Sequence, residues 1–261
     1  YRHSAKALNG FSIHVPKGAI YGFVGENGAG KTTFIRMVCG LQTPTSGTYT
    51  LYGVKNTDKN ILNSQKRIGA VVETPSIYMD MTAKNNLKQQ YQILGLPSYD
   101  GIDELLHLVG LDSVGKKKVK HFSLGMRQRL GIAIALVGSP DFLILDEPSN
   151  GLDPQGMIEI RELILKLNRK KQITILISSH NLDELSRLAT HYGFIAKGRM
   201  VKEITAKELE KVCRKCMKIT VTDTTVLAHV LDIMNIEYEI ISDTVAVSYT
   251  HLRAHETLSD L

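Results

Sequence analysis

A glycine-rich loop near the beginning of the chain limits the possible folds more than any other feature. Residues 25–33 read GENGAGKTT, so Gly25, Gly30, Lys31 and Thr32 fit the spacing Gly-x-x-x-x-Gly-Lys-Thr. An apolar run, AIYGFVG, precedes the loop, and a helical pattern, KTTFIRMVCG, follows it. Strand, loop and helix in this order form the context that such a loop requires to bind phosphates. The sequence therefore predicts a nucleotide-binding fold of the α/β class.

The residue types in this loop suit the phosphate groups of a nucleotide. Gly28 and Gly30 allow backbone N–H groups to turn toward the phosphates, and the following helix adds the positive end of its dipole. We expect Lys31 to reach the outer phosphates and the Thr32 hydroxyl to bind Mg²⁺. The alternative is a glycine-rich turn that binds no nucleotide, and the Lys-Thr pair in this context argues against it. We therefore predict a P-loop that binds ATP with Mg²⁺.

Polar side chains follow two further apolar strands. Asp146 ends the run FLILD, so its carboxylate is expected at the edge of a parallel sheet where ligands bind. We predict that Asp146 holds Mg²⁺, directly or through water, and that Glu147 polarises the attacking water as a general base. A plain turn before Pro148 is the alternative. His180 ends the run ITILISSH and is predicted at the same edge, as a group that orients water or stabilises the transition state, although a lone His after a strand is more often structural.

The pattern of apolar residues divides the chain into four parts. Residues 1–81 and 122–205 alternate short apolar runs with helical patterns, as expected of a parallel sheet covered by helices. Residues 82–121 are helical without a convincing strand and predict an inserted helical subdomain. Residues 206–246 read as a helix followed by strand, helix and strand, a small separate α+β unit. The strands predicted in the core are FSIHV, AIYGFVG, GTYTLYG, RIGAVVE, FLILD and ITILISS.

The last fifteen residues, VSYTHLRAHETLSDL, break this pattern. They resemble the translation of an adapter that is used in transposase-based sequencing libraries. We therefore predict that residues 247–261 are not native sequence, and that the spacing of His251 and His255 has no bearing on metal binding. The chain begins at Tyr1 without a Met, and both ends are expected to be truncated.

The composition of the chain limits where the protein can be located in the cell and which partners it can have. No apolar run approaches the ~18 residues of a membrane span, so we do not expect the chain to cross a membrane by itself. Its 3 cysteines are an odd number and no secretory signal precedes them, which favours a reducing cytoplasm. The net charge of +6 and the lysines at 116–118 and 120 would suit nucleic acid, an anionic membrane surface or a solvated turn. We expect no nucleic-acid partner, because charge alone is not specific.

The motifs, taken in order, resemble those of the ATP-binding-cassette (ABC) ATPases from Tyr1 to about Glu203. The resemblance implies a P-loop NTPase core of the RecA-like type, with Walker A at 25–33 and Walker B at 142–146. Glu147 would then be the catalytic base and His180 the switch histidine. The ATP-binding residues that the resemblance implies are Tyr1, which would stack on adenine, and Gly25, Asn27, Gly28, Ala29, Gly30, Lys31, Thr32 and Thr33.

The resemblance also implies that a second chain completes each ATP site. Ser123, Gly125 and Met126 would contact the γ-phosphate of ATP bound to the opposite chain. The segment SNGLD at 149–153, which ends at Asp153, would be the loop that communicates across the dimer. Two ATP sites would therefore form between two copies of the chain.

Two positions depart from the family pattern. The usual signature LSGGQ reads FSLGM here, so Leu124 replaces a Gly and Met126 replaces the Gln. We expect function to survive, because the Ser123 hydroxyl and the helix N-terminus still supply a phosphate contact. The usual Gln of the coupling loop is Glu73, in VVETPSIY. Its carboxylate can approach Mg²⁺ or water, which makes Glu73 a further candidate metal ligand, but its charge can slow turnover.

The whole motif set is similar to the branch of the family that serves bacitracin-resistance and lantibiotic-immunity exporters. This implies an ATP-hydrolysing motor subunit that pairs with a second copy and a separate membrane permease, peripheral on the cytoplasmic face of the membrane. One alternative is a soluble cassette ATPase that acts on ribosomes or DNA. One P-loop, one signature and no sustained heptads argue against it. The other is a nucleotide switch that hydrolyses ATP poorly because of Glu73 and Met126.

Overall fold

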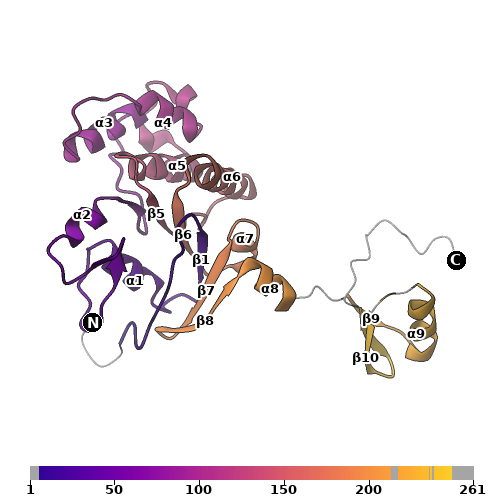
Figure 1. Cartoon of the computed structure of the whole chain (residues 1–261). Helices are drawn as coiled ribbons and strands as arrows, with labels where there is room; N and C mark the ends of the chain where they lie inside the picture. Colours follow the sequence, from indigo (N-terminus) through magenta and orange to yellow (C-terminus); the bar gives the residue numbers. More distant parts are fainter. Residues whose placement is uncertain (1–5, 213–216, 235, 237, 249–261) are drawn as a thin grey trace. The chain divides into compact units, whose positions relative to one another are not determined.

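The computed structural model describes residues 6–212, 217–234, 236 and 238–248. The chain divides into two compact units, Tyr1–Ala206 and Lys207–Leu261, and each is described by itself (Figure 1). The division lies within one residue of the predicted start of the C-terminal unit.

A mostly parallel sheet forms the centre of the first unit. In the described part of this unit, the strands follow the order β4-β5-β6-β1-β7-β8. Neighbouring strands are parallel except for β7 and β8, which are antiparallel. The α/β class is therefore as predicted. The strand bounds are β1 (Ile20–Val24), β4 (Ile68–Val71), β5 (Phe142–Asp146), β6 (Thr174–Ser179), β7 (His191–Ala196) and β8 (Arg199–Thr205), with β2 (Thr50–Leu51) and β3 (Val54–Lys55) in a separate ribbon.

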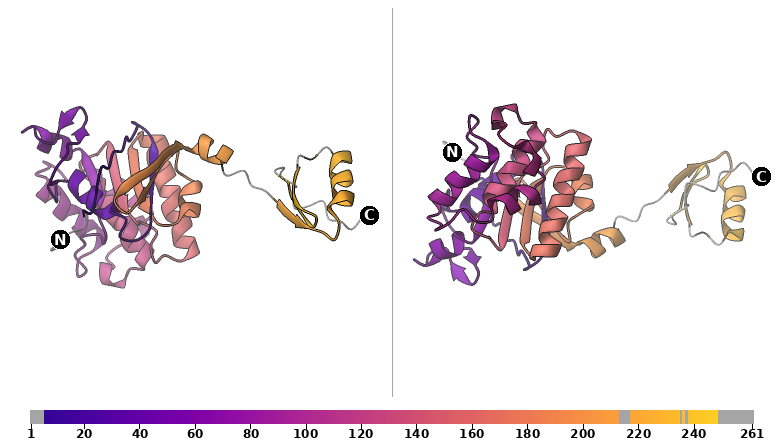
Figure 2. Two further views of the ribbon diagram at one scale, coloured as in Figure 1. Left: turned by 90° about the horizontal axis from the view of Figure 1, so that it is seen from below. Right: turned by 90° about the horizontal axis from the view of Figure 1, so that it is seen from above.

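Helices lie on both faces of this sheet. Figure 2 shows the strands between α1 on one side and α6 on the other. α6 begins at Pro154 with Asp153 as its N-cap, and a proline is well tolerated in the first turn of a helix. The bounds are α1 (Lys31–Val38), α2 (Ile61–Gln65), α3 (Ala83–Ile93), α4 (Ile102–Leu108), α5 (Leu124–Ala135), α6 (Pro154–Lys171) and α7 (Leu182–Ser186).

The segment from 82 to 121 is helical, as its pattern predicts. It contains α3, α4 and two short 3-10 helices, Asp112–Val114 and Val119–His121. The Thr82 hydroxyl caps α3 by accepting a hydrogen bond from the Asn85 N–H at 3.2 Å. A Thr at this position satisfies one of the amides that a helix N-terminus leaves without a partner.

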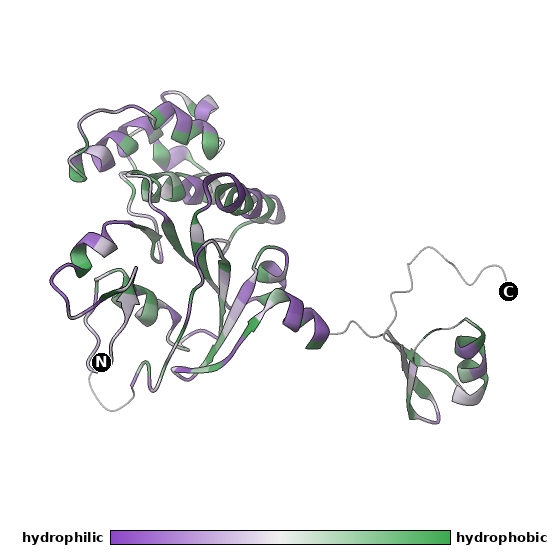
Figure 3. Ribbon diagram, in the orientation of Figure 1, coloured by the Kyte–Doolittle hydropathy of each residue, from purple (hydrophilic) through white to green (hydrophobic). Residues whose placement is uncertain are grey.

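The face of the sheet that packs on α1 holds much of the buried core. Tyr21 and Phe23 on β1 and Leu176 on β6 share this face, because side chains alternate along a strand. Phe11 and Phe34 pack around Phe23, with ring centroids 5.8 and 5.4 Å from it. Figure 3 shows mostly hydrophobic residues along the central strands. Because the strands are held by this core, the loops that follow them start from well-defined positions.

The N-terminal segment differs from its prediction. FSIHV, at 11–15, was expected as a strand, but the structure gives it no strand pairing. Its apolar residues do reach the core, where Phe11, Ile13 and Val15 pack as partly buried side chains. The His14 N–H donates to the side chain of Glu203 on β8 at 3.1 Å, and not to a backbone carbonyl as in a strand pair. The alternation of apolar and polar residues in FSIHV therefore predicts correctly which side chains are buried, but it does not show that the segment pairs with a strand. GTYTLYG is likewise reduced to the two residues of β2.

The second unit is a three-stranded antiparallel sheet with one long helix in its described part. The sheet order is β10-β11-β9, and Leu231 and Ala246 are buried. The sequence predicts one strand after the long helix, whereas the structure has the hairpin of β10 and β11. Val247 and Ser248, in the predicted non-native tail, form part of β11, and the tail from 249 lies outside the described residues. The bounds are α8 (Ala206–Val212), β9 (Met217–Thr220), α9 (Thr224–Ile233), β10 (Tyr238–Ser242) and β11 (Val245–Ser248).

Candidate active site

The glycine-rich loop joins β1 to α1 in a tight turn. Gly30 is the N-cap of α1 with φ 112°, a conformation that is available in practice only to glycine. At Gly25 a Cβ atom would lie 2.5 Å from the Ile195 carbonyl oxygen, so no larger residue fits. The first-turn amides of α1 have no acceptor within the helix, and the helix dipole is positive at this end. The loop therefore has the backbone geometry of an anion site.

Lys31 lies folded back into this loop. Only 5% of the residue is exposed, and its ammonium donates to the carbonyl oxygens of Gly25 at 2.6 Å and Glu26 at 3.2 Å. The same Nζ atom lies 3.1 Å from Oε1 of Glu147. The predicted phosphate-binding Lys31 is thus held beside Glu147, the predicted base, although the two residues are more than a hundred positions apart in the sequence.

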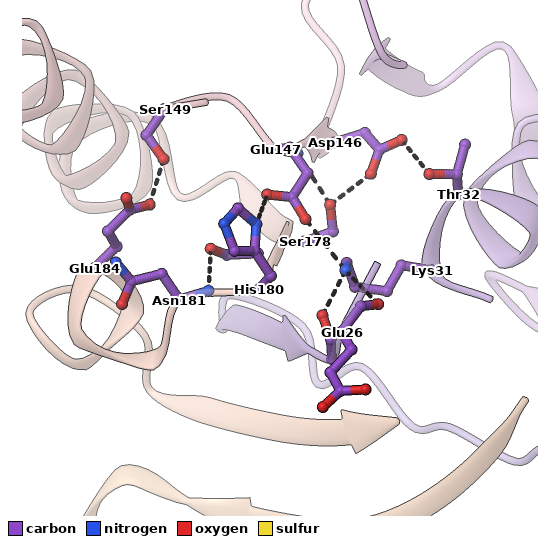
Figure 4. A network of polar contacts seen from close by, with 12 residues as sticks. Glu26, Lys31, Thr32, Asp146, Glu147, Ser149, Ser178, His180, Asn181 and Glu184 are labelled. Atoms are coloured by element: carbon purple, nitrogen blue, oxygen red, sulfur yellow. Dashed lines mark hydrogen bonds and ion pairs between the residues drawn. The ribbon is translucent and has the colours of Figure 1, made fainter. Parts of the chain in front are cut away.

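Asp146 is held by two hydroxyl groups. Thr32 Oγ1 donates to Oδ2 at 2.8 Å, and Ser178 Oγ donates to Oδ1 at 2.5 Å (Figure 4). Asp146 and Thr32, the two predicted Mg²⁺ ligands, are therefore brought together at the carboxyl edge of the sheet. A hydroxyl and a carboxylate are oxygen ligands of the kind that Mg²⁺ prefers, and Mg²⁺ needs few protein ligands when phosphates and water complete its shell. The donor set fits that ion.

Ser178 is a site residue that the sequence interpretation missed. It is fully buried on β6. Its hydroxyl donates a hydrogen bond to Asp146, and its oxygen accepts one from the Glu147 N–H at 3.0 Å. One side chain thus orients both neighbouring acids. The available signal was a Ser inside the buried apolar run ITILISS, because a buried hydroxyl normally has a specific partner.

Glu147 is contacted through both carboxylate oxygens. Oε1 faces Lys31, and Oε2 lies 2.8 Å from Nδ1 of His180 (Figure 4). The backbone of Glu147 has φ 49°, an uncommon value for a residue with a side chain, and such strain persists where the surroundings impose it. Oε1 is buried, and beyond the ion pair with Lys31 it has no hydrogen bond in the described part of the chain. If Glu147 is the base, as the sequence predicts, this is the oxygen that a movement of Lys31 toward phosphate would leave without its partner.

A second contact joins the loops that follow β5 and β6. The Ser149 hydroxyl donates to the carboxylate of Glu184 on α7. Asn181 accepts from the Asp183 N–H at 2.9 Å and so caps the start of α7. These bonds fix the segment that carries His180, which keeps its ring toward Glu147. Nothing in the sequence pattern singled out Ser149 or Glu184 as partners.

The predicted signature residues lie at the start of α5, outside the network around Lys31. Ser123 is the N-cap and accepts from the Met126 N–H at 3.2 Å, a bond that does not use the hydroxyl proton. The predicted dimer loop packs against this helix start. A Cβ at Gly151 would lie 3.3 Å from Leu124, and one at Gly125 would lie 3.8 Å from Leu152.

The remaining predicted residues are placed as follows. Asp153 caps α6 by accepting from the Gly156 N–H at 3.2 Å. Glu73 forms an ion pair with Arg36, and whether it also binds Mg²⁺ stays a prediction. Tyr1 lies outside the described residues. Burial and then the charge of Asp146 raise the pKa of the Cys39 thiol, just after α1, to about 12.

Comparison with known proteins identifies the family. Residues 8–150 match the family model described as ABC transporter. The chain belongs to this family. It is 44% identical to the bacitracin transport ATP-binding protein BcrA of Bacillus licheniformis over 99% of this chain and 85% of that protein. It is 43% identical to the lantibiotic transport ATP-binding protein SrtF of Streptococcus pyogenes, over 75% of this chain and 83% of that protein.

Solved structures agree with the assignment. The structure of cbiO1 from Clostridium perfringens, a part of the ABC transporter complex cbiONQ, superimposes with a TM-score of 0.70. The two are 27% identical, and the match covers 78% of this chain and 84% of that one. A dimeric bacterial ABC transporter cassette, 22% identical, shares the fold with a TM-score of 0.69 over 78% of this chain and 93% of that one. The chain is therefore an ATP-binding subunit and an ATPase.

Proposed function

We propose that two copies of this chain form the motor of an exporter for antimicrobial peptides of the bacitracin or lantibiotic kind. This substrate class is supported by the similarity to BcrA, a bacitracin transport protein, and to SrtF, a lantibiotic transport protein. A separate permease would supply the membrane path, and the motor would sit on its cytoplasmic side. No helix in the described ranges is both long and apolar enough to cross a membrane.

The arrangement of Lys31, Glu147 and His180 carries the proposal for ATP hydrolysis. Lys31 would bind the outer phosphates, and Thr32 and Asp146 would hold Mg²⁺, which supplies charge neutralisation at the phosphates when bound. Turning Lys31 toward phosphate leaves Glu147 free to take a proton from water, while His180 positions that carboxylate. ATP binding would thus break the ion pair between Lys31 and Glu147 and, by doing so, activate Glu147 as the base.

The export proposal is tested by expressing the chain with its permease. The permease gene is sought in the neighbouring reading frame, and both proteins are produced in a bacitracin-sensitive host. We expect growth at higher bacitracin concentrations only when both are present, and ATPase activity of the purified complex that bacitracin stimulates. A lantibiotic is tested in parallel to separate the two substrates. An active ATPase that neither peptide stimulates, with no change in sensitivity, would contradict this substrate class.

A mixed-chain experiment tests whether each ATP site needs two chains. Ser123→Asp keeps a good N-cap but places a negative charge where the γ-phosphate should bind. Lys31→Met removes the phosphate-binding cation. We expect each variant alone to be inactive and a mixture of the two to regain ATPase activity, because one site of the mixed pair keeps both intact elements.

The matched control carries Ser123→Asp and Lys31→Met on one chain and is mixed with the wild type. Each site of that mixed pair has one damaged element, so the pair should add no activity to that of the wild-type pairs. If the mixture of single variants stays inactive while the mixed pairs of the control add activity, the signature does not act across chains.

A further inference from the structure

An ion pair joins Arg36, one turn of α1 beyond Thr32, to Glu73 in the loop that follows β4. Arg36 Nη2 lies 2.5 Å from Glu73 Oε1. Arg36 follows Thr32 by four residues on α1, so the two side chains share one face of the helix and lie one turn apart. Thr32 in turn donates to Asp146 at 2.8 Å. The pair therefore attaches Glu73 to the helix that carries a candidate metal ligand.

The loop of Glu73 is fixed on its other side by α5. Pro75 packs on Gly131, where a Cβ atom would lie 2.6 Å from the proline Cβ. Glu73 itself has φ 59°, which costs free energy for a residue with a side chain and is maintained by the surrounding contacts. One short loop thus contacts both the P-loop helix and the helix that begins with the signature.

We propose that Arg36 is a positioning residue that holds the Glu73 carboxylate and releases it when Mg²⁺ enters with ATP. The inference rests on the proposed Mg²⁺ site. The side chains of the pair are 40% and 57% exposed, and an exposed ion pair contributes little net free energy. A divalent cation can therefore compete with the guanidinium for the carboxylate. A neutral Gln at position 73 would bind both the guanidinium and a divalent cation more weakly, so the competition depends on the carboxylate of Glu73.

The test measures the Mg²⁺ concentration at which binding of a fluorescent ATP analogue is half-maximal. A Glu147→Gln background suppresses hydrolysis, so the readout is binding alone. Arg36→Ala should lower this concentration by about two- to fivefold, the range that an exposed ion pair allows. Arg36→Lys keeps the charge and should shift it less. Adding Glu73→Gln should remove the effect of Arg36→Ala.

Lys84→Ala is the matched control. Lys84 forms an exposed ion pair with Asp103 at 2.8 Å within the helical subdomain, and its loss should not change the half-maximal Mg²⁺ concentration. The inference is overturned if Arg36→Ala leaves that concentration unchanged, or shifts it equally with Glu73→Gln present. Failure of the proposed function gives a different result, because the wild-type chain would then show no Mg²⁺-dependent ATP binding or hydrolysis.

Discussion

Replacing Glu147 with Gln is expected to lower the ATPase rate by about 10²–10⁴-fold, the usual contribution of a positioned general base. Gln keeps the size of the side chain but cannot take a proton from water. The structure places the carboxylate 3.1 Å from Lys31 and 2.8 Å from His180, so its position depends on both partners. ATP binding should persist, because the phosphate contacts come from the P-loop. Steady-state phosphate release and equilibrium ATP binding measure the two effects separately.

Closure of two chains should also survive the Glu147→Gln substitution. ATP-dependent dimerisation, followed by size-exclusion chromatography, should be stronger than in the wild type, since bound ATP is no longer consumed. Glu184→Gln serves as the control, because Glu184 accepts the Ser149 hydroxyl and an amide oxygen can do the same. It should leave the rate close to that of the wild type. A Glu147→Gln chain that hydrolyses ATP within tenfold of the wild-type rate would contradict the assignment of the base.

The central sheet could be predicted because its strands are continuous apolar runs. FLILD and ITILISS are buried on both faces, which leaves little choice of structure, and a parallel arrangement then puts Asp146 and His180 at one edge. The prediction of a strand was wrong for FSIHV, in which apolar and polar residues alternate. Alternating apolar residues also occur in an extended segment that packs on a core without pairing, and only the structure shows where its N–H groups go.

The contacts that tune the site could not be predicted. Ser178 bridges Asp146 and Glu147, and Arg36 pairs with Glu73, through side chains that come from different loops and helices. A local pattern fixes which residues reach the edge of the sheet, but it does not fix rotamers or partners across the sheet. The positive φ of Glu147, whose N–H bonds to Ser178, likewise has no signature in the sequence.

Replacing Lys31 with Met should weaken ATP binding by about 10–100-fold, because hydrogen bonds to charged groups contribute roughly 1.5–3 kcal/mol. Met retains most of the buried stem, so the substitution removes the ammonium and little packing. Lys31→Arg should not restore binding, because the residue is only 5% exposed and a guanidinium is larger than the ammonium group that it would replace. Titration with a fluorescent ATP analogue measures both affinities.

Without nucleotide, the same substitution should lower the free energy of unfolding. Lys31 then no longer offsets the charge of Glu147, whose Oε1 is buried and has no hydrogen bond of its own among the described residues. Adding Glu147→Gln removes that charge and should recover part of the loss. A double-mutant cycle by denaturant unfolding should give a coupling of about 1–2 kcal/mol. Strictly additive effects would mean that the two side chains do not interact in the nucleotide-free chain, and ATP binding would then not activate the base by separating them.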